Sequence, residues 1–119
     1  MSDPRDPDCL FCRIVAGEIP SDRVAEDDRV MVFRDVAPRA PTHVLAVPRR
    51  HVGSMDELTD SPEDSELLAA LFAALRRVAR EAGLTGYRIV SNVGASAGQS
   101  VPHLHVHLLG GRAMSWPPG

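Results

Sequence analysis

Residues Val101 to Leu109 read VPHLHVHLL, and three of the five histidines of the chain alternate there with aliphatic residues. An alternation with a period of two predicts a strand, which we place at about Leu104 to Leu109. On a strand, residues two apart share a face and lie about 6.6 Å apart. We therefore expect His103, His105 and His107 to form a row on one face, while the aliphatic residues between them enter the core.

Two kinds of chemistry suit such a row. The imidazoles could bind a metal, since two histidines two apart on a strand can share one ion. Alternatively, one of them could attack phosphorus, because a neutral imidazole is a good nucleophile near pH 7 without a separate base. The preceding stretch, Asn92 to Ser100, reads NVGASAGQS, and its small residues let backbone N–H groups approach an anion. Gln99 and Ser100 add side-chain donors, so this loop favours a bound phosphate.

The strongest helix signal lies outside this segment, from about Pro62 to Ala82. Ser61 can cap its first turn, proline suits the first helical position, and Gly83 ends it. A shorter helix is expected from about Cys9 to Ala16, capped by Asp8 and ended by Gly17. Further strands are expected at 30–33, 43–47 and 87–91, with turns or loops at 17–23, 36–42 and 92–100 and an irregular tail at 110–119.

This order of elements predicts an α+β fold. We expect a mostly antiparallel sheet of about five strands with one short and one long helix. The length of 119 residues argues for one domain, which we place at 9–119. Residues 1–8 are charged and rich in proline, and we expect them to form a disordered arm.

The composition excludes several classes of protein. Hydrophobic residues make up 44% and charged residues 24%, which argues against intrinsic disorder. Since no apolar run approaches the roughly 20 residues needed to cross a bilayer, we expect no membrane partner. The net charge of −3 without a basic cluster gives no reason to expect nucleic acid. The first eight residues do not form a secretory signal, which predicts a cytoplasmic protein.

The two cysteines, Cys9 and Cys12, form a CxxC pair. In a cytosolic chain such a pair is more often metal-binding or redox-active than a structural disulfide. Alternatively, both could be reduced residues that pack as small hydrophobic groups in the short helix.

The histidine row resembles the signature of the histidine triad superfamily, which is His-x-His-x-His followed by two aliphatic residues. Residues 103–109 match that signature in full. Other stretches resemble the histidine triad nucleotide-binding protein branch, namely residues 33–43, 48–51, 98–100 and 110–119. The resemblance covers about residues 9–119.

The resemblance implies a purine nucleoside phosphoramidase, which cleaves the P–N bond of adenosine 5′-phosphoramidates and related adenylates without an organic cofactor. It implies that His105 attacks the α-phosphorus and becomes nucleotidylated, after which water releases the nucleoside monophosphate. It also implies that Asp35 binds the ribose, that Phe33 and Val36 lie near the base, and that His43 lies at the edge of the site. The phosphate would be surrounded by Asn92, Gly98, Gln99, Ser100 and His107.

The same resemblance implies a homodimer whose two sheets join into one continuous sheet. The tail contains Trp116, the only tryptophan, and the resemblance places it on the partner chain near the partner's active site. An exposed sheet edge, which proteins usually cover or pair, is a second reason to expect this assembly.

The tail resembles the animal-type members of the branch. Those members as a rule lack CxxC, so the cysteine pair is a difference from them. Cys9 and Cys12 resemble instead the pair in many bacterial triad proteins and in hexose-1-phosphate uridylyltransferases, where two cysteines and two histidines hold zinc. By that resemblance the partners are His51 and His103, with His43 as a rival fourth ligand. Two thiolates and two imidazoles make a closed, structural site. The alternative for His51 is a solvated loop residue.

Two other functions remain open from the sequence. One is a nucleotide-binding module with little turnover that acts through protein partners, and the intact histidine row argues against it. The other is a metallohydrolase with zinc on the triad itself, against which stands the absence of a nearby carboxylate as general base. The choice between adenine and guanine is also open, because the expected base pocket is apolar.

Overall fold

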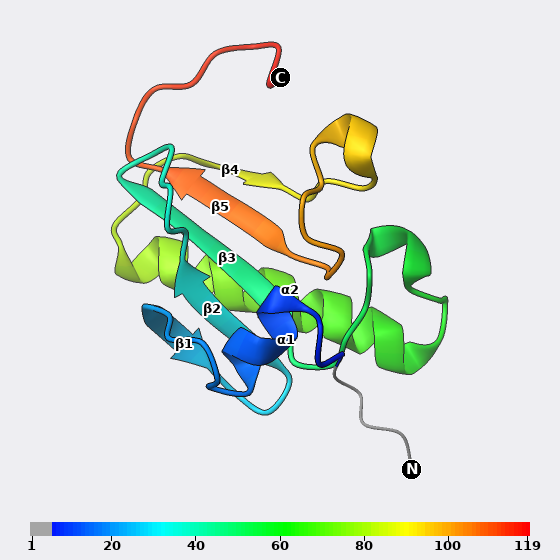
Figure 1. Ribbon diagram of the computed structural model, residues 1–119. Coiled ribbons are helices and arrows are strands. Elements are labelled where there is room, and N and C mark those ends of the chain that lie inside the picture. Colours follow the sequence, from blue (N-terminus) through cyan, green and yellow to red (C-terminus); the bar gives the residue numbers. More distant parts are fainter. Residues whose placement is uncertain (1–5) are drawn as a thin grey trace.

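The computed structural model describes residues 6–119, which form a five-stranded antiparallel sheet with one long and one short helix (Figure 1). The strand order is β1-β2-β3-β5-β4. This arrangement confirms the predicted α+β class. The elements are α1 (Leu10–Val15), β1 (Arg23–Glu26), β2 (Val30–Arg34), β3 (Thr42–Pro48), the 3₁₀ turn η1 (Met55–Glu57), α2 (Pro62–Glu81), β4 (Tyr87–Val90), the 3₁₀ turn η2 (Ala95–Ala97) and β5 (Val106–Gly110).

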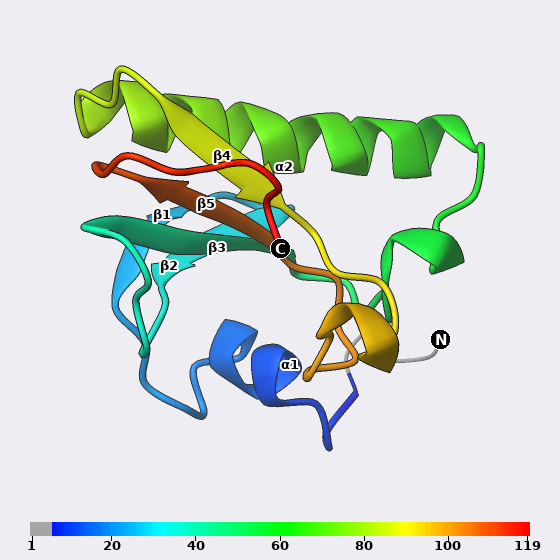
Figure 2. The same cartoon turned by 90° about the horizontal axis from the view of Figure 1, so that it is seen from above.

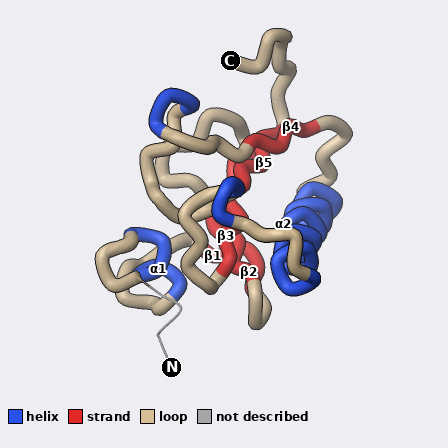
Figure 3. Tube along the Cα trace, turned by 90° about the vertical axis from the view of Figure 1, so that its right-hand side faces the viewer, coloured by secondary structure: helices blue, strands red, loops and turns tan. Residues whose placement is uncertain are grey.

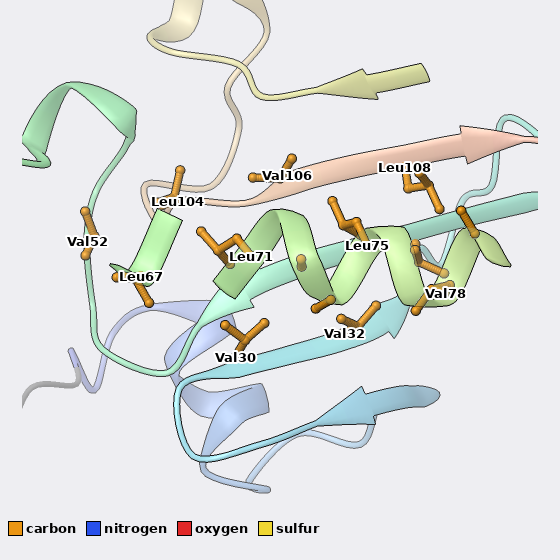
Figure 4. Close-up of a cluster of buried hydrophobic side chains, with 14 residues drawn as sticks. Val30, Val32, Val52, Leu67, Leu71, Leu75, Val78, Leu104, Val106 and Leu108 are labelled. Carbon is orange, nitrogen blue, oxygen red and sulfur yellow. The ribbon is translucent and has the colours of Figure 1, made fainter. Parts of the chain in front are cut away.

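Helix α2 begins and ends as its sequence predicts. Ser61 Oγ accepts a hydrogen bond from the backbone N–H of Asp64 at 3.2 Å, and Pro62 is the first helical residue. Gly83 follows the helix with φ +69°, a conformation that costs glycine little. The apolar stripe of the helix is buried against the sheet (Figure 4). The residues of that stripe are Leu67, Leu71, Ala74, Leu75, Val78 and Ala79.

The sheet separates two layers that cover its opposite faces. Helix α2 lies along one face, and α1 lies on the other together with the loop that contains η2 (Figure 2). The alternating residues Leu104, Val106 and Leu108 pack in the α2 core, as predicted from their period of two. The α1 face has its own buried cluster, to which Phe11 and Phe33 belong. The side chains between the aliphatic residues of the triad segment therefore face the α1 layer.

The expectation about the cap of the first helix needs revision. The N-cap of α1 is Cys9, whose Sγ accepts from the backbone N–H of Cys12 at 3.4 Å, so the expected cap at Asp8 is wrong. Residues 1–5 of the expected arm lie outside the described residues. Within the rest of it, the backbone N–H of Cys9 donates to the carbonyl of Asp6 at 3.0 Å and closes a turn.

The sheet also differs from its prediction at two places. Strand β1 begins at Arg23, where a turn was expected, and only its two central residues, Val24 and Ala25, are apolar. Strand β5 begins at Val106 and not at Leu104. The preceding backbone turns away from the ladder: His103 N–H donates to Val101 O, and Leu104 N–H donates to Val52 O. Only the last histidine of the row therefore lies within a strand.

The tail beyond β5 contains no helix or strand, as its prolines predict. It extends past the β4 edge of the sheet (Figures 1 and 3), where an Arg88 guanidinium N–H donates to the carbonyl of Ser115 at 2.9 Å. Trp116 is 81% exposed. Among residues 6–119, no helix is both long enough and apolar enough to cross a membrane.

Candidate active site and metal centre

The first histidine of the triad is buried between a strand end and the CxxC pair. His103 is fully buried, and its Nε2 lies 2.9 Å from the carbonyl oxygen of Pro48 at the end of β3. A carbonyl only accepts hydrogen bonds, so Nε2 carries the proton and Nδ1 has a free lone pair. Nδ1 lies 3.3 Å from Cys9 Sγ and 3.5 Å from Cys12 Sγ. Burial is the main cause that lowers the pKa of His103 to about 4.

Four side chains from three segments converge at this point. Cys9 and Cys12 come from the start of α1, His51 follows β3, and His103 precedes β5. His51 Nδ1 lies 3.3 Å from Cys12 Sγ, and all four potential ligand atoms lie within 4.8 Å of one another. His43, the rival fourth ligand, is not in this group; it lies in a separate one with Asp35 and His107.

The chemistry of this group fits a tetrahedral metal ion. Two sulfur and two nitrogen atoms are the donor set that structural zinc prefers. The bond from His103 Nε2 to Pro48 O supplies the outer contact that usually orients a ligating imidazole. Burial raises the pKa of the Cys12 thiol to about 11, so an ion would have to displace its proton.

The second histidine of the triad has one ring nitrogen held and the other available. His105 Nδ1 lies 2.7 Å from the carbonyl oxygen of His103 and donates its proton to it. Nε2 therefore has an unprotonated lone pair in the neutral ring. Phe11 supports the ring from one side at a centroid distance of 5.1 Å, and His107 lies at the same centroid distance. Ser91 Oγ donates to the carbonyl of His105 at 2.9 Å and so links it to the end of β4.

The third histidine belongs to a chain of hydrogen bonds with a defined direction. The backbone N–H of Arg39 donates to His43 Nδ1 at 3.0 Å, so the proton of that ring is on Nε2. His43 Nε2 donates in turn to His107 Nδ1 at 3.0 Å. The proton of a neutral His107 is therefore on Nε2, where it can be donated to a substrate.

The electrostatics keep this pair of rings neutral near pH 7. Burial, followed by repulsion from His105 and His43, lowers the pKa of His107 to about 4. Burial also lowers the pKa of His43, although Asp35 opposes that shift. Asp35 Oδ2 lies 3.4 Å from His43 Nε2, and its Oδ1 accepts from the backbone N–H of Ala37 at 2.8 Å.

These orientations argue against a metal ion on the triad itself. The free nitrogen of His103 faces the thiols, the Nδ1 of His105 is used by a carbonyl, and the Nδ1 of His107 is used by His43. A metal on His43 Nε2 would also need the ring proton on Nδ1, where the N–H of Arg39 already donates. The three rings are therefore built for different tasks.

The loop before the triad is organised by Gln99. Its Nε2 donates to the carbonyls of Gly53 and Val101 at 2.8 and 3.0 Å, and its Oε1 accepts from the N–H of Gly94. The side-chain amide expected to contact phosphate thus holds the loop together. Gly98 has φ +94°, which a residue with a side chain rarely adopts. Within residues 6–119, the side-chain donors of Ser100 and Asn92 make no hydrogen bond, so these groups are available to an anion.

The residues expected around the nucleoside lie at the end of β2 and just after it. Phe33, Asp35 and Val36 line one cavity of about 290 Å³. Phe33 is buried, and Val36 is fully exposed. Sequence reasoning did not identify Phe11, which contacts both His103 and His105, or the backbone of Arg39, which sets the tautomer of His43. The position of Phe11 within the CxxC pair was the available signal for the first; nothing in the sequence signalled the second.

Comparison with known proteins places this fold and site in a family. The HIT domain family model matches residues 16–114. The chain belongs to this family, as its histidine triad and fold indicate. It is 46% identical over 115 residues to a 14 kDa zinc-binding protein of Zea mays, with 96% of this chain and 90% of that protein covered. It is 43% identical over 117 residues to the adenylylsulfatase HINT1 of Arabidopsis thaliana, with 98% and 80% covered.

A solved structure supports the same assignment. The crystal structure of a HIT family hydrolase from Legionella pneumophila superimposes with a TM-score of 0.90 at 48% sequence identity. The alignment covers 94% of this chain and 100% of that one. The fold described above is therefore that of HIT family hydrolases over nearly its whole length.

Proposed function

We propose that this protein hydrolyses the P–N bond of purine nucleoside 5′-phosphoramidates and related nucleotidyl substrates. The observation that carries the proposal is the state of His105, whose Nδ1–H is held by the His103 carbonyl at 2.7 Å while Nε2 is left free. An imidazole in this state can attack phosphorus without a separate base. The similarity to an adenylylsulfatase supports a nucleotidyl substrate.

The proposed reaction has two steps and needs no organic cofactor. In the first, His105 Nε2 forms a bond to the α-phosphorus and the P–N bond of the substrate breaks, while the Nε2–H of His107 donates a hydrogen bond to the leaving nitrogen, which takes its proton from water. In the second, water attacks the nucleotidyl-imidazole and gives its proton to the hydroxide formed in the first step, and the P–N bond to His105 breaks. Nucleoside monophosphate leaves and both histidines regain their starting states.

The substrate contacts in this proposal follow the arrangement of the loops. Asp35 binds the ribose, and Phe33 and Val36 lie beside the base. Phosphate is held by the available donors of Asn92 and Ser100, in a loop shaped by Gly98 and Gln99. His43 lies at the edge of the site and holds the proton of His107 on Nε2.

We further propose that Cys9, Cys12, His51 and His103 hold one structural zinc ion. The donor set, its burial and the similarity to a zinc-binding protein support this assignment. When bound, the ion would cross-link α1 to the loop after β3 and to the first residue of the triad, and would have no open position for substrate. Reduced thiols of this kind suit a reducing compartment, and we propose that the protein acts in the cytoplasm.

The experiment that tests the proposed function uses a fluorogenic adenosine 5′-phosphoramidate. We expect steady release of the amine and of AMP, and a sample quenched with denaturant at alkaline pH, where a bond between phosphorus and imidazole nitrogen survives, should contain protein heavier by one adenylyl group on His105. If the protein instead binds AMP but releases no amine from any phosphoramidate, it is a nucleotide-binding module and the hydrolase proposal is wrong. Insensitivity of turnover to a strong chelator would further separate this mechanism from a metallohydrolase.

A further inference from the structure

The start of the tail is held to the loop between β2 and β3 by two contacts. The last residue of β5 pairs with the first residue of β3, which brings Gly111 and Arg112 beside the loop 35–41 (Figure 1). The Nε–H of Arg112 donates to the carbonyl of Arg39 at 2.8 Å. Gly111 lies so close to Pro41 that a Cβ at position 111 would be 3.1 Å from the Cβ of the proline. The chain that leaves β5 therefore fixes this loop in place.

The loop residue that Arg112 holds also contacts the ring of His43. The N–H of Arg39 donates to His43 Nδ1 at 3.0 Å, so the proton of this ring is on Nε2 and is donated to His107 Nδ1. Arg39 thus accepts a hydrogen bond from Arg112 at its carbonyl and donates one to the imidazole at its N–H. Burial lowers the pKa of both rings and keeps them neutral near pH 7, so these hydrogen bonds decide which nitrogen carries each proton.

The N–H of Arg39 sets the direction of the hydrogen bond between the two rings. Without that N–H, His43 could keep its proton on Nδ1 and accept, through Nε2, a hydrogen bond from the Nδ1–H of His107. The Nε2 of His107 would then have a lone pair and no proton. The Asp35 carboxylate also favours the observed direction, but its oxygen is 3.4 Å from His43 Nε2, which is a longer contact. A shift of this loop residue would therefore weaken the donor that His107 presents at the site.

We infer that Arg112 is a positioning residue that keeps the Nε2–H of His107 directed at the substrate. The inference rests on the proposed function, in which this N–H donates a hydrogen bond to the leaving nitrogen. Arg112 acts through Arg39 and His43, and not by contact with the substrate. Its effect comes from one exposed hydrogen bond, so it should not exceed the free energy of such a bond, which corresponds to a change of about fivefold in an equilibrium.

The direct test is nitrogen NMR of isotope-labelled imidazoles in the ligand-free protein. In the wild type, His43 and His107 should each show a protonated Nε2 and an unprotonated Nδ1. Arg112→Met removes the donor and keeps the length of the side chain, so the averaged shifts of both rings should move toward the Nδ1–H form. Arg112→Lys, which keeps a donor, should stay closer to the wild type. Arg29→Met is the matched control, because it removes an exposed arginine that is 3.4 Å from Glu66, and it should leave both rings unchanged.

Kinetics provide a second readout that a purely structural role would not move. Arg112→Met should lower kcat by up to about fivefold for a phosphoramidate with a basic leaving amine. It should lower kcat less for an adenylate whose leaving group departs without assistance. Affinity for AMP should change little, because Asp35 is held by its own bonds to the His43 carbonyl and the N–H of Ala37.

Two outcomes separate this inference from the proposed function. Imidazole shifts in Arg112→Met that match those of the wild type would overturn the inference, whatever the protein hydrolyses. If the shifts move as expected but no phosphoramidate is cleaved, the positioning of the rings is supported and the proposed function is wrong. Trp116→Ala alters the tail and keeps Arg112, so it should leave the protonation of both rings unchanged. A change as large as that in Arg112→Met would assign the effect to the tail as a whole and overturn the role of Arg112.

Discussion

At the scale of single residues, one main-chain contact decides what His105 can do. The carbonyl of His103 accepts a hydrogen bond from the Nδ1–H of His105 and leaves Nε2 free, so the His105 ring is ready to act before substrate arrives. The ring of His103 directs its Nδ1 toward the cysteines and its Nε2 toward the carbonyl oxygen of Pro48. His103 thus connects the candidate metal centre to the candidate nucleophile through its own backbone.

Replacement of His105 tests this assignment directly. His105→Ala and His105→Asn should lower kcat for a nucleoside phosphoramidate by at least about 10³-fold, because they remove the group that forms the covalent intermediate. Affinity for AMP should stay close to that of the wild type, since the ribose and base contacts lie elsewhere. The measurement is steady-state kinetics alongside equilibrium binding. Near-normal turnover in either variant would contradict the role of His105.

The sequence anticipated these residues unevenly. The alternation in residues 103–109 correctly predicted which side chains enter the α2 core. It also predicted that the strand begins at Leu104, and this is wrong, since the N–H of Leu104 donates to Val52 O and β5 begins at Val106.

At the scale of elements, short contacts between α2, the loops and the strand ends hold the site in place. Asp64 in the first turn of α2 accepts from Arg50 at 2.6 Å and from the N–H and Oγ1 of Thr59. These bonds, that of Arg50 first, lower the pKa of Asp64 to about 2. Arg50 precedes His51 in the chain, so this ion pair also anchors a proposed metal ligand.

This ion pair predicts a defined dependence of stability on pH. A carboxyl whose pKa is lowered by folding stabilises the fold above its unfolded pKa and loses that effect as the pH falls through its folded value. Asp64→Asn should therefore lower the melting temperature at pH 7, and its difference from wild type should shrink as the pH falls from about 4 to about 2. Glu63→Gln, whose exposed carboxylate lies 3.7 Å from the same arginine, is the control and should change little. A difference that is constant over that range would contradict the assignment.

The CxxC helix offers a second test at this scale. If zinc is held as proposed, purified protein should contain about one ion per chain. Cys9→Ser should lose the ion and melt at a lower temperature, because a closed metal site contributes to folding. Leu10→Ser is the control, because it introduces a serine on the exposed side of α1, and this variant should keep the ion. Elemental analysis and thermal unfolding provide the readouts. Metal-free protein whose melting is unaffected by a chelator would remove zinc from the proposal.

Elements were predictable where their signals are local. The cap and the first proline of α2 predicted its start at Pro62. Strand β1 could not be predicted, because only Val24 and Ala25 are apolar and its pairing with β2 supplies the rest of its stability. Asp8 looked like the cap of α1 from its type alone, whereas the geometry of the CxxC turn gives that position to the sulfur of Cys9.

At the scale of the whole molecule, the exposed features concentrate at one end. Strand β4 is an edge of the sheet, the tail extends past it, and Trp116 is 81% exposed. At the start of the tail, Arg112 Nε donates a hydrogen bond to the carbonyl of Arg39 at 2.8 Å. This bond holds the tail to the loop after β2, which also contains Pro41. An open edge beside an exposed tryptophan is a surface that proteins usually cover. We therefore propose a symmetric homodimer joined along β4.

Removal of the tail tests this proposal and the part that the tail takes in catalysis. Light scattering at micromolar concentration should give twice the mass of one chain. Deletion of residues 113–119 keeps the Arg112 contact. It should change the relative rates across a series of leaving amines more than it changes the rate at which His105 attacks phosphorus. The reason is that the tail would border the leaving-group side of the partner's site. Trp116→Ala in the full-length chain should reproduce much of that change. A monomeric mass would contradict the dimer, and unchanged relative rates would refute the role of the tail.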